Sequence, residues 1–592
     1  MKAGLLAFGA LIWAAPVAAQ DPLAPLQTVS PSKPAPAVPS ANQPGLAIVP
    51  PAAQPPLAPA SSIAVPKDWR GVFDAIDSGN WASARAGIAV LPSSILTPLA
   101  KAELYTAKGS PVVDLASLQS LIAEAPELPQ AEQLALMAMK RGSTAPLLVV
   151  PERPTVNLGS APVRYRTRPT QGEPMADQLR AILDQLIRAD DAQGAEAQLL
   201  VYAPQLSAEA RAEAGQRTAF VYYVLGLDMD ARRVADSWRQ GATGEWAAQS
   251  AWIAGLASWR MSDCQSASQS FQQAAAYAQQ RELRAAALYW AARSEQACGR
   301  PRGVAPLLKA AAQSPESFYG LVARETLGMD TKLAADPYAG FDPRVDHLPN
   351  VQRAVELVRI GEPALAEELL RHQAKIGLPT EHHALIQVAK KLDLPAAQLW
   401  LANNGQPGAR SFASDRYPNP RWIPLTGWRV DPALAFGHVV QESSFRRAAV
   451  STAGAVGLMQ VRPGSAGDMA RARGLPYSAG MLTDPRANLE FGQSYIEMLR
   501  GSSATAGQLP RVIASYNAGP LPVSRWASIN DKGDPLLWIE SIPYWETRYY
   551  VPSVLRNMWI YQGLNNEDTT TLKDVAQHRW PAFPTGMTKL SH

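Results

Sequence analysis

A single glutamate, Glu442, is followed along the chain by residue types that could support acid and base chemistry. The later segments are Gly457-Leu458-Met459-Gln460, Ser515-Tyr516-Asn517-Ala518-Gly519-Pro520 and Ile542-Pro543-Tyr544-Trp545-Glu546-Thr547-Arg548. A carboxyl group that holds a proton near neutral pH can donate it to a leaving oxygen and later accept another. A nearby amide, phenol and second carboxyl group could bind hydroxyl or acetamido groups. The ordered set therefore suits acid/base cleavage of a sugar polymer.

The residues before Glu442 predict the helix that positions it. Asp431 suits the N-cap, Pro432 suits the first helical position, and the helix should continue to about Ser443. Glu442 would then lie in the last turn, where the helix dipole and apolar neighbours both raise the pKa of a carboxyl group. Taken alone, Glu442 is better explained as a surface glutamate than as a catalytic one. His438, on the same helix face, could tune the pKa of Glu442 or serve only as a buried structural histidine.

The glycine-containing segments are expected to shape the site around this helix. Gly457 permits a close backbone approach and a positive φ, and Gln460 offers both an acceptor and donors. The run Tyr516-Asn517-Ala518-Gly519-Pro520 has the pattern of a helix end that turns through its glycine. Each pattern alone is weak, because tyrosine and asparagine near a helix end are usually core and cap residues.

Together, these motifs resemble the soluble lytic murein transglycosylase family. The resemblance rests on Glu442-Ser443, Gly457-Leu458-Met459-Gln460, Tyr516-Asn517-Ala518-Gly519-Pro520 and the run from Ile542 to Val551. It implies a goose-lysozyme-like α-helical catalytic domain with Glu442 as the sole catalytic acid/base. Glu442 would protonate the oxygen between N-acetylmuramic acid and N-acetylglucosamine, then deprotonate the muramic 6-hydroxyl as it attacks the anomeric carbon. The product would be a 1,6-anhydro end, formed without water and without the second carboxylate of most glycosidases.

The resemblance also implies which residues contact the saccharide. It places Gln460, Tyr516 and Glu546 near the sugar, and less firmly Ser443, Met459 and Asn517. It implies no metal and no cofactor. One position departs from the family, because Arg462 stands where methionine is common. Its guanidinium could pair with a carboxylate of a peptide stem or with an acid of the protein itself.

Two other functions remain open at this stage. A hydrolase of the lysozyme type would cut the same bond with water and leave a reducing end. A helical-repeat scaffold would bind glycan without cutting it.

The N-terminus has the pattern of an export signal. Lys2 is followed by an apolar run from Leu5 to Ala15 and by the small residues Val17-Ala18-Ala19, so residues 1–19 are predicted to be a signal peptide for export to the periplasm. Residues 20–66 are rich in proline and alanine and are predicted to be a disordered linker. No later segment has the uninterrupted apolar length of a membrane span.

The rest of the chain predicts an all-α protein. Apolar spacing and a weak repeat of about 34 residues predict a solenoid-like α-superhelical domain at 67–345, with a Pro-rich surface excursion near 146–174. A small helical linker domain is expected at 346–415, a lysozyme-like catalytic domain at 416–565 and a tail at 566–592.

Charge and cysteine content limit the possible partners. The 55 basic residues nearly balance the 51 acidic ones, which argues against a nucleic-acid-binding protein. The family resemblance implies peptidoglycan glycan strands as the partner. Cys264 and Cys298 could pair in an oxidising compartment. However, equivalent positions in stacked hairpins lie about 10 Å apart, whereas a disulfide needs Cα atoms within about 7 Å. Sequence alone leaves this pairing open.

Overall fold

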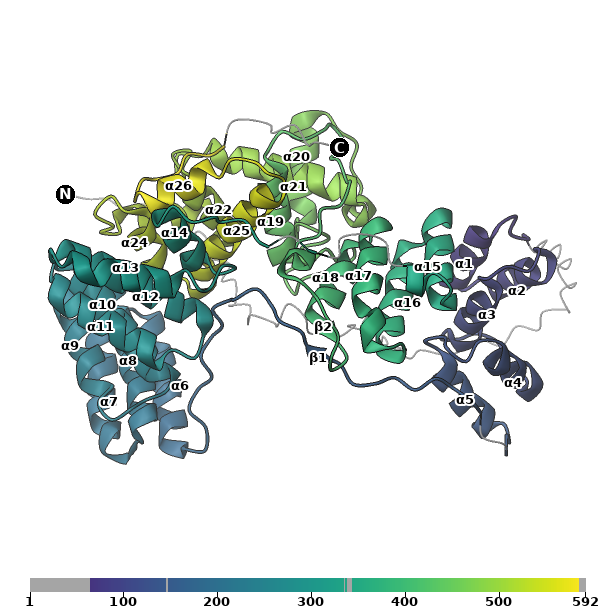
Figure 1. Ribbon diagram of the computed structural model, residues 1–592, viewed down its shortest axis with the longest axis horizontal. Coiled ribbons are helices and arrows are strands. Elements are labelled where there is room, and N and C mark those ends of the chain that lie inside the picture. Colours follow the sequence, from purple (N-terminus) through teal and green to yellow (C-terminus); the bar gives the residue numbers. More distant parts are fainter. Residues whose placement is uncertain (1–63, 145–146, 335, 338–342, 585–592) are drawn as a thin grey trace, which may run out of the picture. The chain divides into compact units, whose positions relative to one another are not determined.

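The computed structural model describes residues 64–144, 147–334, 336–337 and 343–584 (Figure 1). The expected signal peptide and nearly all of the expected linker lie outside these residues. The all-α prediction is confirmed, because the described chain is built from helices and holds a single two-stranded antiparallel sheet. That sheet pairs Val156 of β1 (Val156–Asn157) with Gly405 of β2 (Asn404–Gly405). None of the described helices is long and apolar enough to cross a bilayer.

The chain forms two compact units, and the smaller one is discontinuous in sequence. It combines residues up to Pro154 with residues Pro343–Leu378. Arg353 links the two parts, because its Nη1 lies 2.6 Å from Glu127 Oε1. The helices of this unit are α1 (Trp69–Asp77), α2 (Trp81–Val90), α3 (Thr97–Thr106), α4 (Leu115–Glu124), α5 (Ala131–Lys140), α15 (Pro349–Ile360) and α16 (Pro363–Ile376).

The larger unit begins with a series of antiparallel helices, here called the helical stack (Figure 1). Its members are α6 (Pro174–Arg188), α7 (Ala192–Tyr202), α8 (Ala208–Val224), α9 (Asp228–Trp238), α10 (Glu245–Arg260), α11 (Cys264–Tyr277), α12 (Arg281–Ala297), α13 (Pro301–Ala311) and α14 (Phe318–Thr326). Its core contains many small alanine side chains together with large aromatic ones, among which Trp252 and Trp290 are fully buried.

Glutamates at near-equal intervals join successive hairpins of the stack. Glu209 Oε1 accepts hydrogen bonds from the amides of Thr243 and Gly244, at 2.8 and 3.0 Å. Glu245 accepts in the same way from Gln279, at 2.7 Å, and Glu282 from Phe318, at 3.1 Å. Amides at or just before a helix start lack intrahelical acceptors, so each carboxylate satisfies the beginning of a later helix. The repeat of helical hairpins is therefore visible in these glutamate hydrogen bonds as well as in the packing of the helices.

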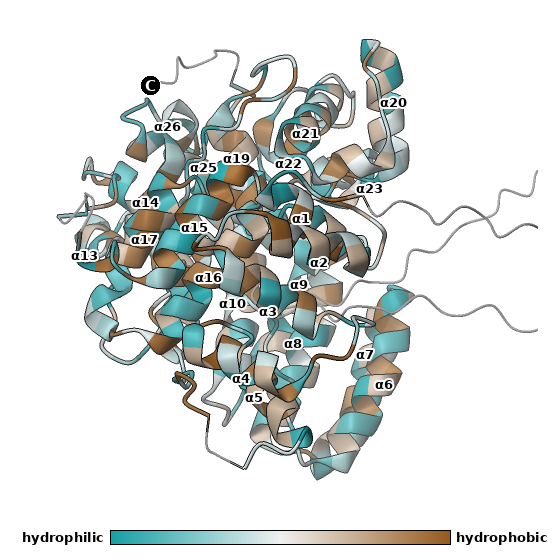
Figure 2. Ribbon diagram, turned by 90° about the vertical axis from the view of Figure 1, so that its right-hand side faces the viewer, coloured by the Kyte–Doolittle hydropathy of each residue, from teal (hydrophilic) through white to brown (hydrophobic). Residues whose placement is uncertain are grey.

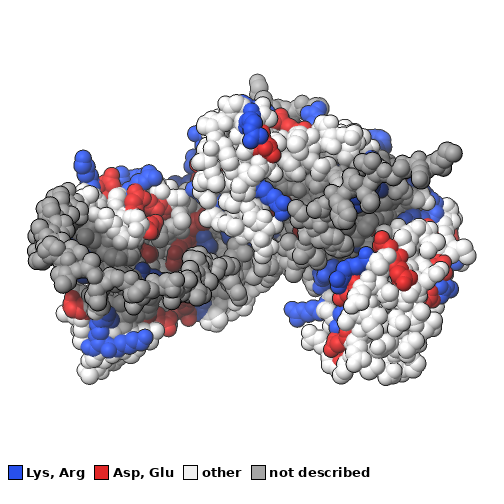
Figure 3. Space-filling view, turned by 180° about the vertical axis from the view of Figure 1, so that it is seen from behind, with Lys and Arg blue, Asp and Glu red and all other residues white. Residues whose placement is uncertain are grey.

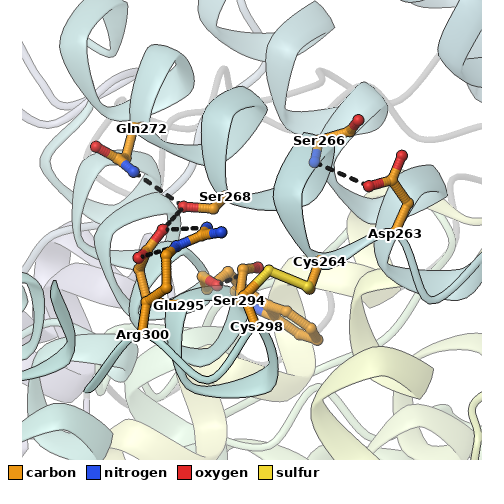
Figure 4. Close-up of a disulfide and its surroundings, with 10 residues drawn as sticks. Asp263, Cys264, Ser266, Ser268, Gln272, Ser294, Glu295, Cys298 and Arg300 are labelled. Carbon is orange, nitrogen blue, oxygen red and sulfur yellow. Dashed lines mark hydrogen bonds and ion pairs between the residues drawn. A yellow bond between two sulfur atoms is a disulfide. The ribbon is translucent and has the colours of Figure 1, made fainter. Parts of the chain in front are cut away.

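A disulfide between Cys264 and Cys298 settles the pairing that sequence left open (Figure 4). The two cysteines are not at equivalent points of successive hairpins. Cys264 begins α11 and Cys298 directly follows α12, so they lie at the same end of two adjacent antiparallel helices. Their Cα atoms are 5.5 Å apart, within the range that a disulfide requires.

The Pro-rich segment before α6 is more than a surface excursion. Arg164, in this segment, is almost fully buried and forms two hydrogen bonds with Glu540, at 3.0 and 3.2 Å. Its guanidinium also lies over the rings of Trp252 and Tyr549, at 4.9 and 5.0 Å. This extended segment therefore connects the stack to the C-terminal helices.

The remaining helices complete the larger unit. α17 (His382–Lys391) and α18 (Pro395–Asn403) precede the C-terminal set, so the helices within residues 346–415 are divided between the two units. The C-terminal set comprises α19 (Pro432–Glu442), α20 (Pro463–Arg473), α21 (Pro485–Arg500), α22 (Leu509–Ala518), α23 (Pro520–Arg525), α24 (Pro535–Glu540), α25 (Trp545–Leu564) and α26 (Thr570–Ala576). α26 lies in the expected tail and contacts α25, because Trp559 Nε1 donates to Thr571 Oγ1 at 2.8 Å.

Candidate active site

The helix predicted to carry Glu442 is present and nearly matches the expected residues. Asp431 caps α19 by accepting a hydrogen bond from the amide of Ala433 at 2.8 Å, and Pro432 is its first residue. Residues 432–439 of the helix are buried, and its ribbon is mostly brown, the colour of hydrophobic residues, in Figure 2. It ends at Glu442, one residue before the predicted end, so Glu442 lies in its last turn as expected.

Gly437 allows α19 to lie directly against α25. A Cβ atom at this position would come within 3.1 Å of the carbonyl oxygen of Val554 and 3.3 Å of the amide nitrogen of Met558. Asn557 Nδ2 also donates to the carbonyl oxygen of Gly437 at 3.2 Å. This close approach brings the end of α19 opposite the first turns of α25.

Glu442 is half-buried, and Tyr550 of α25 donates a hydrogen bond to its Oε1. The pKa of Glu442 is raised to about 7, mainly by burial and to a smaller extent by the nearby charge of Glu546, while the hydrogen bond from Tyr550 opposes the shift. Among the described residues, no lysine, arginine or histidine forms an ion pair with this carboxyl group. Glu442 can therefore hold a proton at neutral pH and also release it.

Tyr550 is the main site residue that the sequence analysis did not assign. It lies inside the run from Ile542 to Val551, but nothing in the spacing indicates that its hydroxyl reaches a carboxyl group 108 residues earlier. The same hydroxyl lies 2.7 Å from Nδ1 of His438, which is fully buried. His438 is thus connected to Glu442 through Tyr550.

The Gly457–Gln460 turn is fixed by contacts that only glycine permits. Gly457 has φ +80°, and a Cβ atom there would lie 2.2 Å from both Asn488 Nδ2 and the carbonyl oxygen of Leu482. Asn488 in turn accepts a hydrogen bond from the amide of Met459 at 2.8 Å. The Met459 side chain is buried against α21, where a Cβ on Gly492 would lie 2.2 Å from its sulfur.

Gln460 and Tyr516 hold this turn beside Glu442. Gln460 Nε2 donates to the carbonyl oxygens of Ala449 and Gly457, at 3.1 and 2.8 Å, which leaves Oε1 as the atom that could accept from a ligand. Tyr516 donates to the carbonyl oxygen of Met459 at 2.7 Å. Burial raises the pKa of Tyr516 well above its usual value, with a further contribution from the Glu442 charge.

Asn517 and Glu546 form a pair on the exposed side of the site. Asn517 Nδ2 donates to Glu546 Oε1 at 3.2 Å, and Asn517 Oδ1 accepts from Thr547 Oγ1 at 2.6 Å. Gly519 follows with φ +83°, as expected for a helix end turning through glycine. Glu546 is exposed and available to a ligand.

Two of the expected saccharide contacts have side chains that point into the protein. Ser443 is buried and its hydroxyl donates to the carbonyl oxygen of Val439 at 3.3 Å, and Met459 is fully buried. Their contact with sugar stays a prediction, with Met459 supporting the turn from beneath. Arg462 is exposed before α20 and forms no ion pair with an acid within the described ranges.

One group of potential metal ligands lies elsewhere in the larger unit. His383 Nε2 is 3.0 Å from Asp336 Oδ2 and 3.9 Å from Asp415 Oδ2. A hydrogen bond joins His383 to Asp336, and none of the three residues belongs to the motifs around Glu442.

The fold and the site define an α-helical domain with one proton-holding glutamate at a helix end. Residues 424–539 match the family model described as Transglycosylase SLT domain. The chain is 30% identical over 254 residues to a soluble lytic murein transglycosylase of Escherichia coli K12, covering 40% of this chain and 38% of that protein. A soluble lytic murein transglycosylase of Salmonella typhimurium is 27% identical over 310 residues, covering 49% of this chain and 46% of that protein.

The chain thus spans less than half the length of these two curated relatives. A solved structure of an inactive mutant of lytic transglycosylase Slt from Pseudomonas aeruginosa is similar over 84% of this chain and 86% of that one. The TM-score is 0.50 and the identity 19%, so this likeness concerns the fold.

Proposed function

We propose that this chain is a lytic transglycosylase that cleaves the β-1,4 bond between N-acetylmuramic acid and N-acetylglucosamine in peptidoglycan. The observation that carries the proposal is the environment of Glu442, whose pKa is raised to about 7 mainly by burial. The SLT family match of residues 424–539 and the names of the curated relatives support the choice of substrate.

In the proposed reaction, Glu442 acts twice. Oε1 accepts from Tyr550, so the proton is carried on Oε2 and passes from there to the glycosidic oxygen as the bond breaks. The resulting carboxylate removes the proton of the muramic 6-hydroxyl, whose oxygen bonds to the anomeric carbon. This step restores protonated Glu442 and leaves a 1,6-anhydro end.

The neighbouring groups have supporting roles in this proposal. Gln460 Oε1 is positioned to accept a hydrogen bond from a substrate N–H or hydroxyl, and exposed Glu546 from a hydroxyl. Because the acid must begin protonated, activity should decline as the pH rises through about 7, the pKa of Glu442.

A periplasmic location is part of the same proposal. The Cys264–Cys298 disulfide suits an oxidising compartment, and residues 1–19 have the sequence pattern of an export signal. In the view of Figure 3, small groups of basic and of acidic side chains both lie on the described surface, and neither sign covers it continuously. This surface agrees with a glycan substrate better than with a polyanion such as nucleic acid.

Hydrolysis of the same bond is the second candidate, and Glu546 is the observation that favours it. Its charge lies near enough to raise the pKa of Glu442, and a second carboxylate can activate water in a glycosidase. Glu546 is, however, already hydrogen-bonded to Asn517.

The experiment that tests the proposed function is mass spectrometry of muropeptides released from purified peptidoglycan. The wild-type chain should release anhydro products, and Glu442→Gln, which preserves shape but removes the acid, should release almost none. Equal release by the variant would reject Glu442 as the acid. No release by either protein would favour a glycan-binding scaffold.

A further inference from the structure

A fully buried imidazole that the proposed reaction does not use lies one helical turn before the acid. His438 has no exposed surface, and its Nδ1 is 2.7 Å from the hydroxyl of Tyr550, which in turn is hydrogen-bonded to Glu442. Its ring also packs 4.4 Å from the ring of Tyr516, centroid to centroid. Three side chains from α19 and α25 thus form one hydrogen-bonded chain, Glu442–Tyr550–His438.

The tyrosine hydroxyl can donate its single hydrogen in only one direction. If Nδ1 of His438 carries a hydrogen, Nδ1 donates to the Tyr550 oxygen and the hydroxyl must donate to Glu442. If Nδ1 is bare, it competes with Glu442 for the hydroxyl hydrogen. The tautomer of His438 therefore decides whether the Tyr550 hydroxyl donates its hydrogen to Glu442.

The surroundings of His438 select one tautomer. Burial lowers the pKa of His438 to about 3, so the ring is neutral and carries one hydrogen. Nε2 is buried and has no hydrogen-bond partner among the described residues. A buried N–H without an acceptor is costlier than a buried acceptor without a donor, so the hydrogen belongs on Nδ1, where Tyr550 can accept it.

We propose that His438, held as the Nδ1–H tautomer, is a positioning residue that fixes the Tyr550 hydroxyl as a donor to Oε1 of Glu442. This deepens the proposed function and rests on it. The arrangement keeps Oε1 unprotonated and confines the transferable proton to Oε2. It also stabilises the carboxylate that remains after the proton has been given to the leaving oxygen. No net proton moves through His438, because it keeps its hydrogen throughout.

The other groups facing Glu442 do not supply this orientation. Glu546 acts only through its charge, and Tyr516 donates to the carbonyl oxygen of Met459 instead. Tyr550 is therefore the one hydrogen-bond donor to Glu442 among the described side chains, and only His438 supports it from behind.

The test compares two substitutions at position 438. His438→Leu removes the donor, whereas His438→Asn places an amide N–H close to where Nδ1–H lies. For His438→Leu we expect kcat to fall about tenfold, KM to stay within about twofold and the alkaline limb of the kcat profile to move up by about one pH unit. His438→Asn should restore the wild-type profile and most of kcat. An unchanged profile in His438→Leu, or equal loss in both variants, would overturn the proposal.

Tyr550→Phe tests the same hydrogen bond without a change at His438, so the proposal stays testable if a histidine variant fails to fold. It should move the alkaline limb in the same direction as His438→Leu, and the double variant should show no further shift, because both changes remove the same hydrogen bond. If the double variant moved the alkaline limb by the sum of the two single shifts, Tyr550 and His438 would not act through the same hydrogen bond, and the proposal would be wrong. If the wild-type enzyme releases no anhydro product, the proposed function fails first, and that outcome is separate from a failure of this inference.

Nitrogen NMR of histidine-labelled protein gives a readout that does not depend on activity. The chain has seven histidines, and the His438→Asn spectrum identifies the signal that disappears. We expect that signal to report a neutral ring protonated at Nδ1 from pH 5 to pH 9. A ring protonated at Nε2 would contradict the proposal.

Discussion

Two glutamates in the larger unit show how their surroundings decide what a carboxyl group can do. Glu295, at the end of α12, forms two hydrogen bonds with Arg300, each of 2.7 Å, and accepts a further one from Ser268 (Figure 4). The hydrogen bond from Arg300 is the main reason that its pKa is lowered to about 2. Glu442 is half-buried, pairs with no cation in the described chain and has a pKa raised to about 7.

The difference separates a structural carboxylate from a catalytic acid. Glu295 stays ionised at any pH at which the protein would work, so its charge serves the packing of the stack. Glu442 has one hydrogen-bond donor and a like-charged neighbour, so its ionised form is penalised and both forms are populated near neutral pH. In the stack, several hydrogen-bond donors stabilise the ionised form of Glu295. In the active site, Glu442 has only one such donor among the described residues, so its ionised form is stabilised less.

The largest expected contrast is in activity. Glu442→Gln should reduce kcat by about 10²- to 10⁴-fold, the usual contribution of a general acid, whereas Glu295→Gln should stay within about twofold of wild type. Release of muropeptides under initial-rate conditions measures both. Comparable losses of kcat in the two variants would contradict the assignment of Glu442 as the catalytic acid and Glu295 as a structural carboxylate.

Removing the disulfide should affect the stack and leave the acid unchanged. Cys264→Ser combined with Cys298→Ser releases a loop with a sequence separation of 34. On a chain-entropy basis this should lower the free energy of unfolding by about 3 to 4 kcal/mol. Denaturant unfolding checks the stability, and the pH profile of kcat should keep its alkaline limb. A shifted limb would show that the stack controls the Glu442 environment.

The raised pKa of Glu442 should cost stability at alkaline pH. The folded-state pKa of about 7 exceeds the unfolded value of about 4.3, so unfolding releases a proton between these values and stability falls as the pH rises through them. Glu442→Gln should therefore be more stable than wild type by up to about 3 kcal/mol at pH 8 and nearly equal to it at pH 4. Equal stability at pH 8 would indicate that the carboxyl group is well solvated.

Glu295 should behave in the opposite way and with a smaller effect. Its pKa of about 2 lies below the unfolded value, so its contribution is present above about pH 4 and is lost as the pH falls toward 2. Glu295→Gln should lower stability by about 1 to 2 kcal/mol at pH 7, with the difference from wild type shrinking on acidification. Thermal unfolding across this range measures it, and a difference that persists at pH 2 would exclude the pairing with Arg300 as the cause.

Local signals in the sequence were enough to predict the helix that carries the acid. Asp431 and Pro432 define where α19 begins, and the glycine in the Gly457–Gln460 turn reflects a backbone that passes too close to Asn488 for any side chain. The residues that produce these features lie within short segments, so the features can be predicted from the local sequence.

Contacts between distant segments were not predictable in the same way. The partners of Glu442 come from α25, and His438 gains its significance only once Gly437 brings α19 and α25 together. The disulfide depended on α11 and α12 being adjacent and antiparallel, which repeat spacing alone did not indicate. Likewise, the spaced glutamates of the stack act on helices that begin a full hairpin later.

Digestion of peptidoglycan in water labelled with heavy oxygen tests the central claim most directly, because it asks whether Glu442 transfers a proton within the glycan or activates water. The account predicts muramic products that end in a 1,6-anhydro ring and contain no heavy oxygen. Reducing ends carrying the label at the anomeric carbon would contradict it and identify the enzyme as a hydrolase.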